Sequence, residues 1–430
     1  MKKYFRVVFL SAFAFWNAQS QTVLTLEQCL AMARERSPRL RSAQNSIRAT
    51  ELAQREVGTT GLPQVHVQAT PFYAPYSRNF GYDPTSTDGG QLAGQIVVQQ
   101  SLYDGGIRSL RSEQLGIDLD RSGHEFRMAD RDLTFSVKQA FIETLQSEQE
   151  ARLELESVVQ LNDYLDVVKR LFNGGSASYT DVLKTELQRS NAQISYQKAL
   201  DDLSVAKYSL AELIGSVIDA SFSIQGSLDT HPIPSIDSVI SIANSDSIRN
   251  IELTIADLAV KSGLLGVEMT RHESWPVISL SGDAGYLSSG SNLKLAPSDR
   301  ASAVGFGFGL VVDIPLINWG ATDLRVQQQQ LAVSNLRLET DQLQRSITTE
   351  SRKTVLQLVR LRIRLQTFRQ SLKNAEENFV LTKSKFVGGG TLSLEVLAAQ
   401  QLLTETRLAE LQTQADIQLL TAKLEQLTTR

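Results

Sequence analysis

The feature that most constrains the fold of this chain is a duplication of its own sequence. Residues 170–183 read RLFNGGSASYTDVL and residues 384–397 read SKFVGGGTLSLEVL. The Gly-Gly pairs begin at Gly174 and Gly388, so the offset is 388 minus 174, or 214 residues. At the same offset SLYDGG, at 101–106, aligns with PLINWG, at 315–320. A repeat of this length predicts two structurally equivalent halves rather than unrelated globular domains.

Each half contains two segments in which apolar residues alternate with polar or very small ones. Alternation with period two is typical of a β-strand, because successive side chains leave opposite faces of the pleat. The segments span about 62–74 and 91–103 in the first half, and about 276–287 and 303–316 in the second. The apolar positions of the two segments that align best are Leu92, Ile96, Val98, Phe306, Phe308, Leu310 and Val312.

This pattern favours strands that cross a membrane, where a lipid-facing set alternates with a lumen-facing set. Aromatic residues near the strand ends fit the interfacial belts of such barrels; the candidates are Tyr73, Tyr103, Tyr286 and Trp319. Four strands cannot close a barrel, since about eight is the minimum and an open edge cannot lie in lipid. Several chains must therefore share one barrel. Two copies would give eight strands and three would give twelve, and the sequence alone leaves both open.

The N-terminus has the features of an export signal. Lys2, Lys3 and Arg6 precede an apolar run from Val7 to Trp16, and a plausible cleavage site follows Ser20, so residues 1–20 are predicted to be a signal peptide. Removing three basic residues changes the formal net charge from −4 to −7, which disfavours nucleic acid as a partner. A single cysteine, Cys29, excludes an intrachain disulfide framework.

Two long spans without proline predict unusually long helices. All ten prolines lie outside residues 85–231 and 316–430, and proline breaks helix interiors. We expect helices at about 107–172 and 321–386, each about 100 Å long at 1.5 Å per residue, with returning helices at about 179–215 and 394–427. Apolar spacings of three and four near each turn predict coiled-coil seams. The seams are Val158, Leu161, Leu165, Val168 and Phe172, and then Leu372, Ala375, Phe379, Thr382 and Phe386.

The predicted organisation is therefore a signal peptide followed by two repeats. Residues 21–215 form the first repeat, with a helix, two strands and two long helices; residues 216–236 form a linker; and residues 237–430 form the second repeat. The second seam has Ala375 and Thr382 where the first has Leu161 and Val168. Either the second hairpin opens more easily, or a small register shift compensates.

These features together resemble the TolC-like outer-membrane efflux proteins. The residues that support the resemblance are LTLEQCLAMARERSP at 24–38, the SLYDGG and INWG junctions, and the two glycine turns followed by Asp-Val-Leu or Glu-Val-Leu. The resemblance implies an α+β membrane protein: a homotrimer with one twelve-stranded β-barrel, four strands from each chain, continuous with a periplasmic tunnel of α-helical coiled coils. It also implies a location in the outer membrane, contact with its lipid, and a passive duct.

The resemblance further implies a partner at the hairpin tips, a periplasmic adaptor that connects the channel to an inner-membrane pump. The residues at matching positions are Gly174, Gly175, Thr180, Asp181, Val182, Leu183, Gly388, Gly389, Leu394, Glu395, Val396 and Leu397. In this family the periplasmic end is closed by acidic or bulky side chains near the tip. Here the matching register gives Phe379 and Thr382, with Glu376 nearby, so the candidate gate is a bulky constriction at Phe379 with any acidic ring at Glu376. The alternative for Phe379 is a place in the coiled-coil seam.

An enzyme is not expected. The four histidines, His66, His124, His231 and His272, are scattered, and no HExxH motif or cysteine cluster predicts a metal site. VGFGFG lacks the Gly-Lys-Ser/Thr of a phosphate-binding loop, so no cofactor is predicted. The main alternative function is a periplasmic coiled-coil adaptor or scaffold without a pore. Within the efflux function, small-molecule and protein cargo stay open, because the pump largely chooses the cargo.

Overall fold

The computed structural model describes residues 23–72, 91–215, 222–228, 250–289 and 302–428. The predicted signal peptide, Tyr73 and most of the predicted linker lie outside these residues. In the described residues two very long helices dominate, α4 at Ile107–Asn173 and α8 at Ala321–Val387, each of 67 residues. Both exceed the predicted ranges by one residue at the C-terminal end. Chain contacts divide the protein into two compact units, and α4 and α8 each contribute to both.

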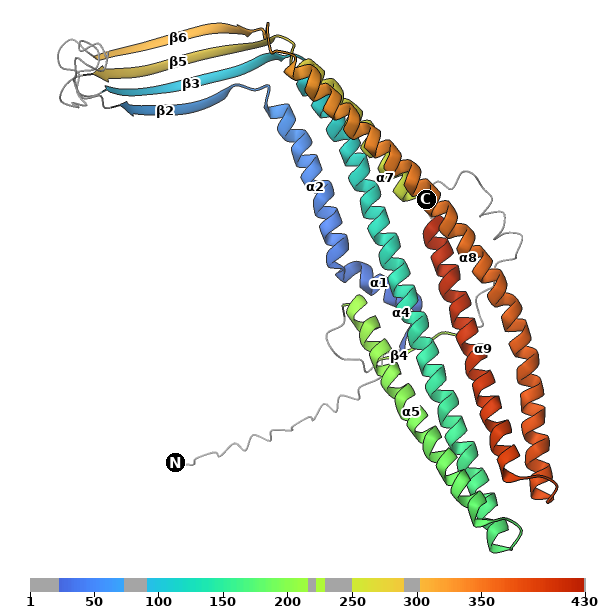
Figure 1. Cartoon of the computed structure of the whole chain (residues 1–430). Coiled ribbons are helices and arrows are strands. Elements are labelled where there is room, and N and C mark those ends of the chain that lie inside the picture. The colour runs from blue at the N-terminus through green and yellow to red at the C-terminus, as the bar shows by residue number, and fades with distance from the viewer. Residues whose placement is uncertain (1–22, 73–90, 216–221, 229–249, 290–301, 429–430) are drawn as a thin grey trace, which may run out of the picture. The chain divides into compact units, whose positions relative to one another are not determined.

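The first unit contains Met1–Ser37, Leu133–Ile236 and Leu356–Lys423. Within it α4 is followed by α5, at Tyr179–Leu213, and α8 is followed by α9, at Ser393–Thr428, so that two antiparallel hairpins lie side by side (Figure 1). Helix α1, at Leu26–Arg36, joins this unit through Arg34, which donates to Thr134 Oγ1, and through Arg36, which donates to the carbonyl of Gly215. Cys29 on α1 is fully buried, and burial raises the pKa of its thiol to about 11.

The second unit contains Pro38–Asp132, Asp237–Val355 and Leu424–Arg430. Its helices are α2, at Pro38–Thr59, α7, at Ile251–His272, and the N-terminal parts of α4 and α8. Thr50 on α2 hydrogen-bonds Ser122 on α4, and Gln114 on α4 donates to the Ser262 carbonyl on α7. These contacts place α4 between α2 and α7 within this unit.

The same unit holds a four-stranded antiparallel sheet in the order β2-β3-β5-β6 (Figure 1). The strands are β2 at Gln64–Phe72, β3 at Gln91–Asp104, β5 at Val277–Ser289 and β6 at Ser302–Asp313. Each repeat supplies one hairpin of this sheet, and β3 pairs with β5 across the repeats. Strands β2 and β6 form its two edges.

Three local features differ from the sequence prediction: the end of one strand, the division of the opening helix, and a strand within the linker. Strand β6 ends at Asp313 rather than near 316, because Pro315 has no N–H and disfavours continued pairing. The opening helix is split at Ser37, which is extended before Pro38, so α1 and α2 are separate helices. The predicted linker contains a strand: β4, at Ser223–Ile224, pairs in parallel with β1, at Val23–Leu24. Two-residue strands are too short for periodicity to indicate them.

The two repeats share their strand-to-helix turns in atomic detail. In the first, the side chain of Asp104 accepts from the N–H of Gly106; in the second, the side chain of Asn318, 214 residues later, accepts from the N–H of Gly320. Gly105, between them, has a φ of 71°, and its counterpart Trp319 has a φ of 55°. A tryptophan therefore adopts a left-handed conformation that normally favours glycine.

Candidate functional site

The hairpin tips are tight turns with a residue in the left-handed region. Gly175 and Gly389 both have a φ of 75°, and each donates its N–H to the carbonyl of the phenylalanine three residues before it. Helix α5 then starts with a capping box, in which Ser178 and Asp181 each bond the other's backbone N–H. In the second tip Thr391 donates to the carboxylate of Glu395. The tips are therefore fixed by local hydrogen bonds as well as by packing.

The predicted tip residues separate into an exposed and a buried set. Val182, Val396 and Leu397 are buried in the hairpin core, so their side chains do not lie on the surface of the tips in this chain. They follow the helical period inward, which a match of short motifs does not distinguish. Asp181 is half-buried and used as a cap. The exposed set is Gly174, Gly175, Thr180, Leu183, Gly388, Gly389, Leu394 and Glu395.

The core of the two hairpins contains most residues of both predicted seams, but not Phe172 or Thr382. Val158, Leu161, Leu165 and Val168 are buried, and they form one cluster with Ala375, Phe379 and Phe386. Phe172, also assigned to the first seam, is 40% exposed instead and lies against Tyr179 at 5.9 Å between ring centroids. Leu171, its neighbour, packs on the core in its place. At the end of α4 the core-facing position is therefore Leu171, one residue earlier than predicted, and Phe172 faces outward.

A buried tyrosine joins the two hairpins at this core. Tyr164 on α4 donates its hydroxyl hydrogen to Ser393 Oγ at the start of α9, over 3.0 Å, and its ring lies 5.6 Å from that of Phe386. Burial raises the pKa of Tyr164 to about 12 and outweighs the lowering effect of its hydrogen bond with Ser393, so the phenol stays neutral at physiological pH. This contact connects residues 229 positions apart.

The three candidate gate residues have different surroundings. Phe379 is only 9% exposed and belongs to the hairpin core, which agrees with the seam alternative rather than with a side chain that projects into a tunnel. Thr382 is half-buried and donates to Asn378. Glu376 is exposed and pairs with Arg407 on α9 at 2.9 Å, and Arg407 also reaches Glu156 on α4 at 3.4 Å.

The strand register divides the sheet into an apolar and a polar face. Directly paired residues share a face, so Val67, Ile96, Ala284 and Phe306 form one row and Gln68, Gln95, Gly285 and Gly305 form the next, on the opposite face. The predicted lipid-facing residues Ile96, Val98, Phe306, Phe308, Leu310 and Val312 all fall on the apolar face and are exposed. Leu92 is in β3, but its side chain lies outside the described residues.

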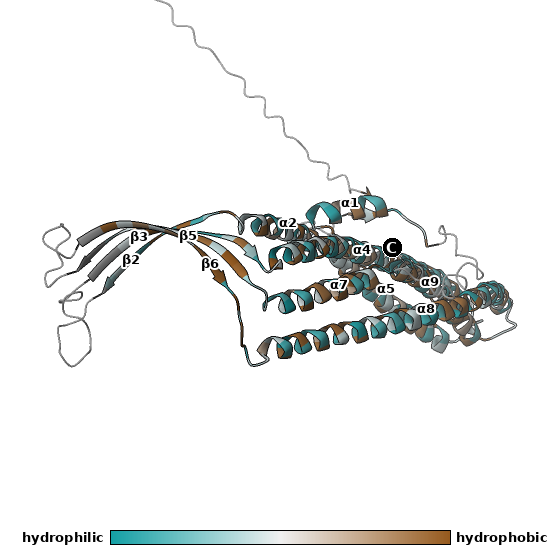
Figure 2. Cartoon of the chain, turned by 90° about the horizontal axis from the view of Figure 1, so that it is seen from above, coloured by the Kyte–Doolittle hydropathy of each residue, from teal (hydrophilic) through white to brown (hydrophobic). Residues whose placement is uncertain are grey.

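The exposure of this apolar face is the most unusual property of the sheet. Phe306 and Phe308 are each 83% exposed, although water-exposed sheet faces usually carry polar side chains. Among the described residues, no helix is long and apolar enough to cross a bilayer, and polar and apolar residues alternate along the helices in Figure 2. Nor do the described His, Cys, Asp and Glu side chains form a group of three or more suited to a metal ion.

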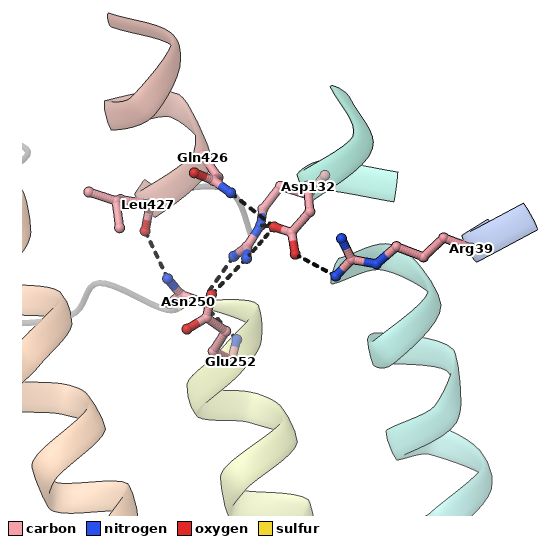
Figure 3. Close-up of polar contacts among 7 residues, drawn as sticks. Arg39, Asp132, Asn250, Glu252, Gln426 and Leu427 are labelled. Carbon is pink, nitrogen blue, oxygen red and sulfur yellow. Dashed lines mark hydrogen bonds and ion pairs between the residues drawn. The ribbon is translucent and has the colours of Figure 1, made fainter. Parts of the chain in front are cut away.

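An ionic cluster around the buried Arg131, which the sequence did not predict, joins α2, α4, α7 and the last turn of α9 in the second unit (Figure 3). Arg131 on α4, with a side chain 7% exposed, pairs with Glu252 on α7 at 2.6 Å and with Asp132 at 2.8 Å. Burial alone would lower the pKa of Arg131, but the hydrogen bonds and charges of these two carboxylates outweigh it and raise that pKa. Asp132 also binds Arg39 on α2 and Gln426 on α9.

The last turn of α9 is tied to the same cluster. Asn250, the N-cap of α7, accepts from the N–H of Glu252 and donates its side-chain amide to the carbonyl of Leu427 (Figure 3). No short motif signals these residues, because their charges become partners only after the repeats fold together. Single charged positions in a polar helix are otherwise typical of a solvent-exposed face.

With this geometry established, comparison with known proteins decides the family. Residues 29–216 and 245–430 both match the outer membrane efflux protein family. The chain belongs to that family. It is therefore an outer-membrane protein, and the two matched segments correspond to the two predicted repeats in order.

Individual relatives of this efflux family member are distant. Outer membrane efflux protein BepC of Brucella suis biovar 1 is 22% identical over 75% of this chain and 68% of BepC. Alkaline protease secretion protein AprF of Pseudomonas aeruginosa is 22% identical over 72% of this chain, which spans 63% of AprF. The outer membrane protein VceC of Vibrio cholerae has the same fold, with a TM-score of 0.76, 16% identity, and coverage of 94% of this chain and 95% of VceC.

Proposed function

We propose that this chain is the outer-membrane channel component of a tripartite efflux or type I secretion system. It would be a passive duct from the periplasm to the cell exterior. The observation that supports this best is the sheet: one face is apolar and exposed, the opposite face is polar, and the edge strands β2 and β6 each pair on one side only in the described part of the chain.

Closure of the sheet requires further copies of the chain. In lipid an unpaired N–H or C=O costs several kcal/mol, so β6 of one copy must pair with β2 of the next. Four strands from each of three copies, 3 × 4, make a twelve-stranded barrel, and two copies would make eight. We propose the homotrimer, because its wider lumen leaves room for cargo while a barrel of about eight strands is filled by side chains.

Exposed helical stripes support the same assembly. Leu324, Leu331 and Leu338 on α8 repeat every seven residues and are all exposed. On α5, Leu187 and Ile194 are spaced and exposed in the same way. A seven-residue apolar repeat is typical of a coiled-coil seam, which needs a facing helix. Neighbouring copies of the chain would supply these helices.

A matched pair of lysine substitutions tests the membrane part of this proposal. Phe308→Lys puts a charge on the apolar face, which costs roughly 2–4 kcal/mol near the bilayer midplane, whereas Gln99→Lys puts it on the polar face. The first variant should lose heat-modifiable oligomers and recovery in outer-membrane fractions, and the second should keep both. Equal behaviour of the two variants, or a wild-type protein that is a monomer without detergent, would refute the channel.

We place a periplasmic adaptor of an inner-membrane pump on the exposed hairpin tips. Leu183, five residues after the Ser178 cap of α5, and Leu394, the second residue of α9, are 47% and 56% exposed and offer apolar contacts at the tips, where Leu392 is exposed as well. Leu394→Asp should abolish capture of the adaptor in crosslinking experiments while the trimer persists. The control is Ala398→Asp, an exposed position one turn further along α9. Capture that is unaffected by Leu394→Asp would exclude this contact.

Within the duct we propose Glu376 as the acidic residue of the periplasmic gate, near Thr382. Its carboxylate is held by Arg407, so opening at this level would have to rearrange that ion pair. A pore-less adaptor or scaffold, the alternative function, would have no use for an exposed apolar sheet face. Cargo is not set by these features: BepC is named for efflux and AprF for protease secretion.

A further inference from the structure

The four strands carry charge of one sign only. Their charged residues are Asp104, Asp283 and Asp313, and none of the four strands contains lysine or arginine. Asp104 and Asp313 lie in the last row of the sheet, at the ends of β3 and β6. Asp104 is also committed to the turn, where it accepts from the N–H groups of Gly106 and Arg108. Asp283 is the charged residue in the middle of the sheet.

The register places Asp283 on the polar face. Its row across the sheet is His66, Val97, Asp283 and Gly307. The row on one side contains Gln64, Gln99, Ser281 and Gly309, and the row on the other side contains Gln68, Gln95, Gly285 and Gly305. The carboxylate therefore lies between Val97 and Gly307 in its own row, with neutral amides, a hydroxyl and glycines in the rows beside it and His66 two strands away.

Glycines leave this carboxylate uncovered. A Cβ added to Gly307 would come within 3.0 Å of Asp283 Oδ1, so the side chain of Asp283 lies over the backbone of β6 where no other side chain stands. Asp283 is exposed and makes no ion pair among the described residues. The glycine alternation of β6 thus has a specific consequence: it gives the carboxylate space and removes any group that would shield it.

We propose that Asp283 sets the ionic preference of the barrel lumen, favouring cationic solutes and repelling anionic ones. This rests on the proposed trimeric channel, in which three copies bring three carboxylates to one level. Rings of Asp or Glu make pores select cations, because the combined field of the carboxylates attracts cations into the lumen and repels anions. No lysine or arginine on the strands offsets these charges.

The test is the reversal potential of the trimer in a planar bilayer under a potassium chloride gradient. The wild type should prefer potassium to chloride, Asp283→Asn should lower the permeability ratio severalfold, and Asp283→Lys should reverse the preference. Asp313→Asn, on the same face at the strand end, is the matched control and should have a smaller effect. An equal effect of the two asparagine variants would overturn the assignment.

Chemical modification after assembly separates selectivity from folding. The native Cys29 thiol is buried and its pKa is raised to about 11, which makes it a poor nucleophile, so the wild type serves as the unreactive control. In Asp283→Cys, a sulfonatoethyl thiol reagent should restore cation preference and a trimethylammonium reagent should give anion preference. If Asp283→Cys conducts but neither reagent changes its reversal potential, the role of Asp283 is refuted while the channel function stands. A wild type that does not conduct refutes the channel as well.

Discussion

At the scale of single residues, the strand-to-helix turns show what the duplication keeps and what it changes. Asp104 and Asn318 make the same turn, yet the left-handed position between turn and helix holds Gly105 in one repeat and Trp319 in the other. A non-glycine residue in this region costs roughly 1–3 kcal/mol. Trp319 is 93% exposed, so packing within the chain does not offset that cost. Its position after β6 agrees with an aromatic side chain at the membrane interface.

Gly105→Ala should destabilise the second unit by about 1–3 kcal/mol, because the φ is 71° and a Cβ would lie 3.0 Å from the carbonyl oxygen of His272. Gly94→Ala is the control, since its Cβ would meet nothing within 4 Å. Denaturant unfolding of detergent-solubilised protein, followed by circular dichroism, measures the difference. Equal midpoints for the two variants would contradict the strain.

Glu154→Gln should change how stability depends on pH. Burial, and secondly the charge of Glu150, raise the pKa of Glu154 in the fold, so the wild type is favoured at low pH and loses stability as pH rises through that pKa. The variant stays neutral and should melt higher than the wild type at pH 7, with convergence below about pH 4, where both side chains are uncharged. A difference in melting temperature between wild type and variant that stays constant from pH 4 to pH 7 would contradict the raised pKa of Glu154.

At the scale of elements, the two hairpins are coupled by a shared core rather than by separate seams. Val168, Phe379 and Val396, from α4, α8 and α9, belong to one buried cluster. Tyr164 adds a hydrogen bond from α4 to Ser393 on α9. The second seam compensates for the smaller Ala375 and Thr382 in two ways. Phe379 is larger than its counterpart Leu165, and Phe386 is more deeply buried than its counterpart Phe172. The core packing of the second hairpin therefore shows no deficit relative to the first.

Phe379→Ala should lower the free energy of unfolding by about 3–5 kcal/mol, because it empties a place in this core. Val380→Ala, next to it and 63% exposed, should change it by less than about 1 kcal/mol. Thermal melting and single-channel conductance, measured on the same samples, distinguish a role of Phe379 in the hairpin core from a role as the gate of the tunnel. A conductance increase in Phe379→Ala at unchanged melting temperature would show that the ring constricts the tunnel.

At the scale of the whole molecule, the exposed stripe on α8 predicts self-association. Leu331→Asp interrupts the seven-residue repeat of Leu324, Leu331 and Leu338 without touching a buried residue, since Leu331 is 67% exposed. The helix content should stay unchanged while the oligomer is lost in native mass spectrometry. Gln329→Asp, exposed on the opposite face of the same helix, should leave the oligomer intact. A stable oligomer in Leu331→Asp would exclude this stripe from the interface.

The sequence predicted the large elements well because their signals are long. Proline-free spans gave both 67-residue helices to within one residue, and alternation gave the faces of the four strands except at the end of β3, where the register shifts between Ser101 and Tyr103. It failed where one residue decides: Val182 and Leu397 point inward, Phe172 points outward, and β4 has two residues. The Arg131 cluster was invisible because its partners come from separate helices. Trp319 could have been found, since the repeat aligns it with Gly105.

The equal length of α4 and α8 limits how this protein can evolve. Both helices span 67 residues from a strand junction to a glycine turn. At 1.5 Å per residue, an insertion of one heptad into a single helix would displace its turn by about 10 Å along the axis and break the pairing of Tyr164 with Ser393. Insertions and deletions in α4 or α8 are therefore expected to be tolerated only when the other repeat changes by the same length. The gene would have to change length in both repeats together.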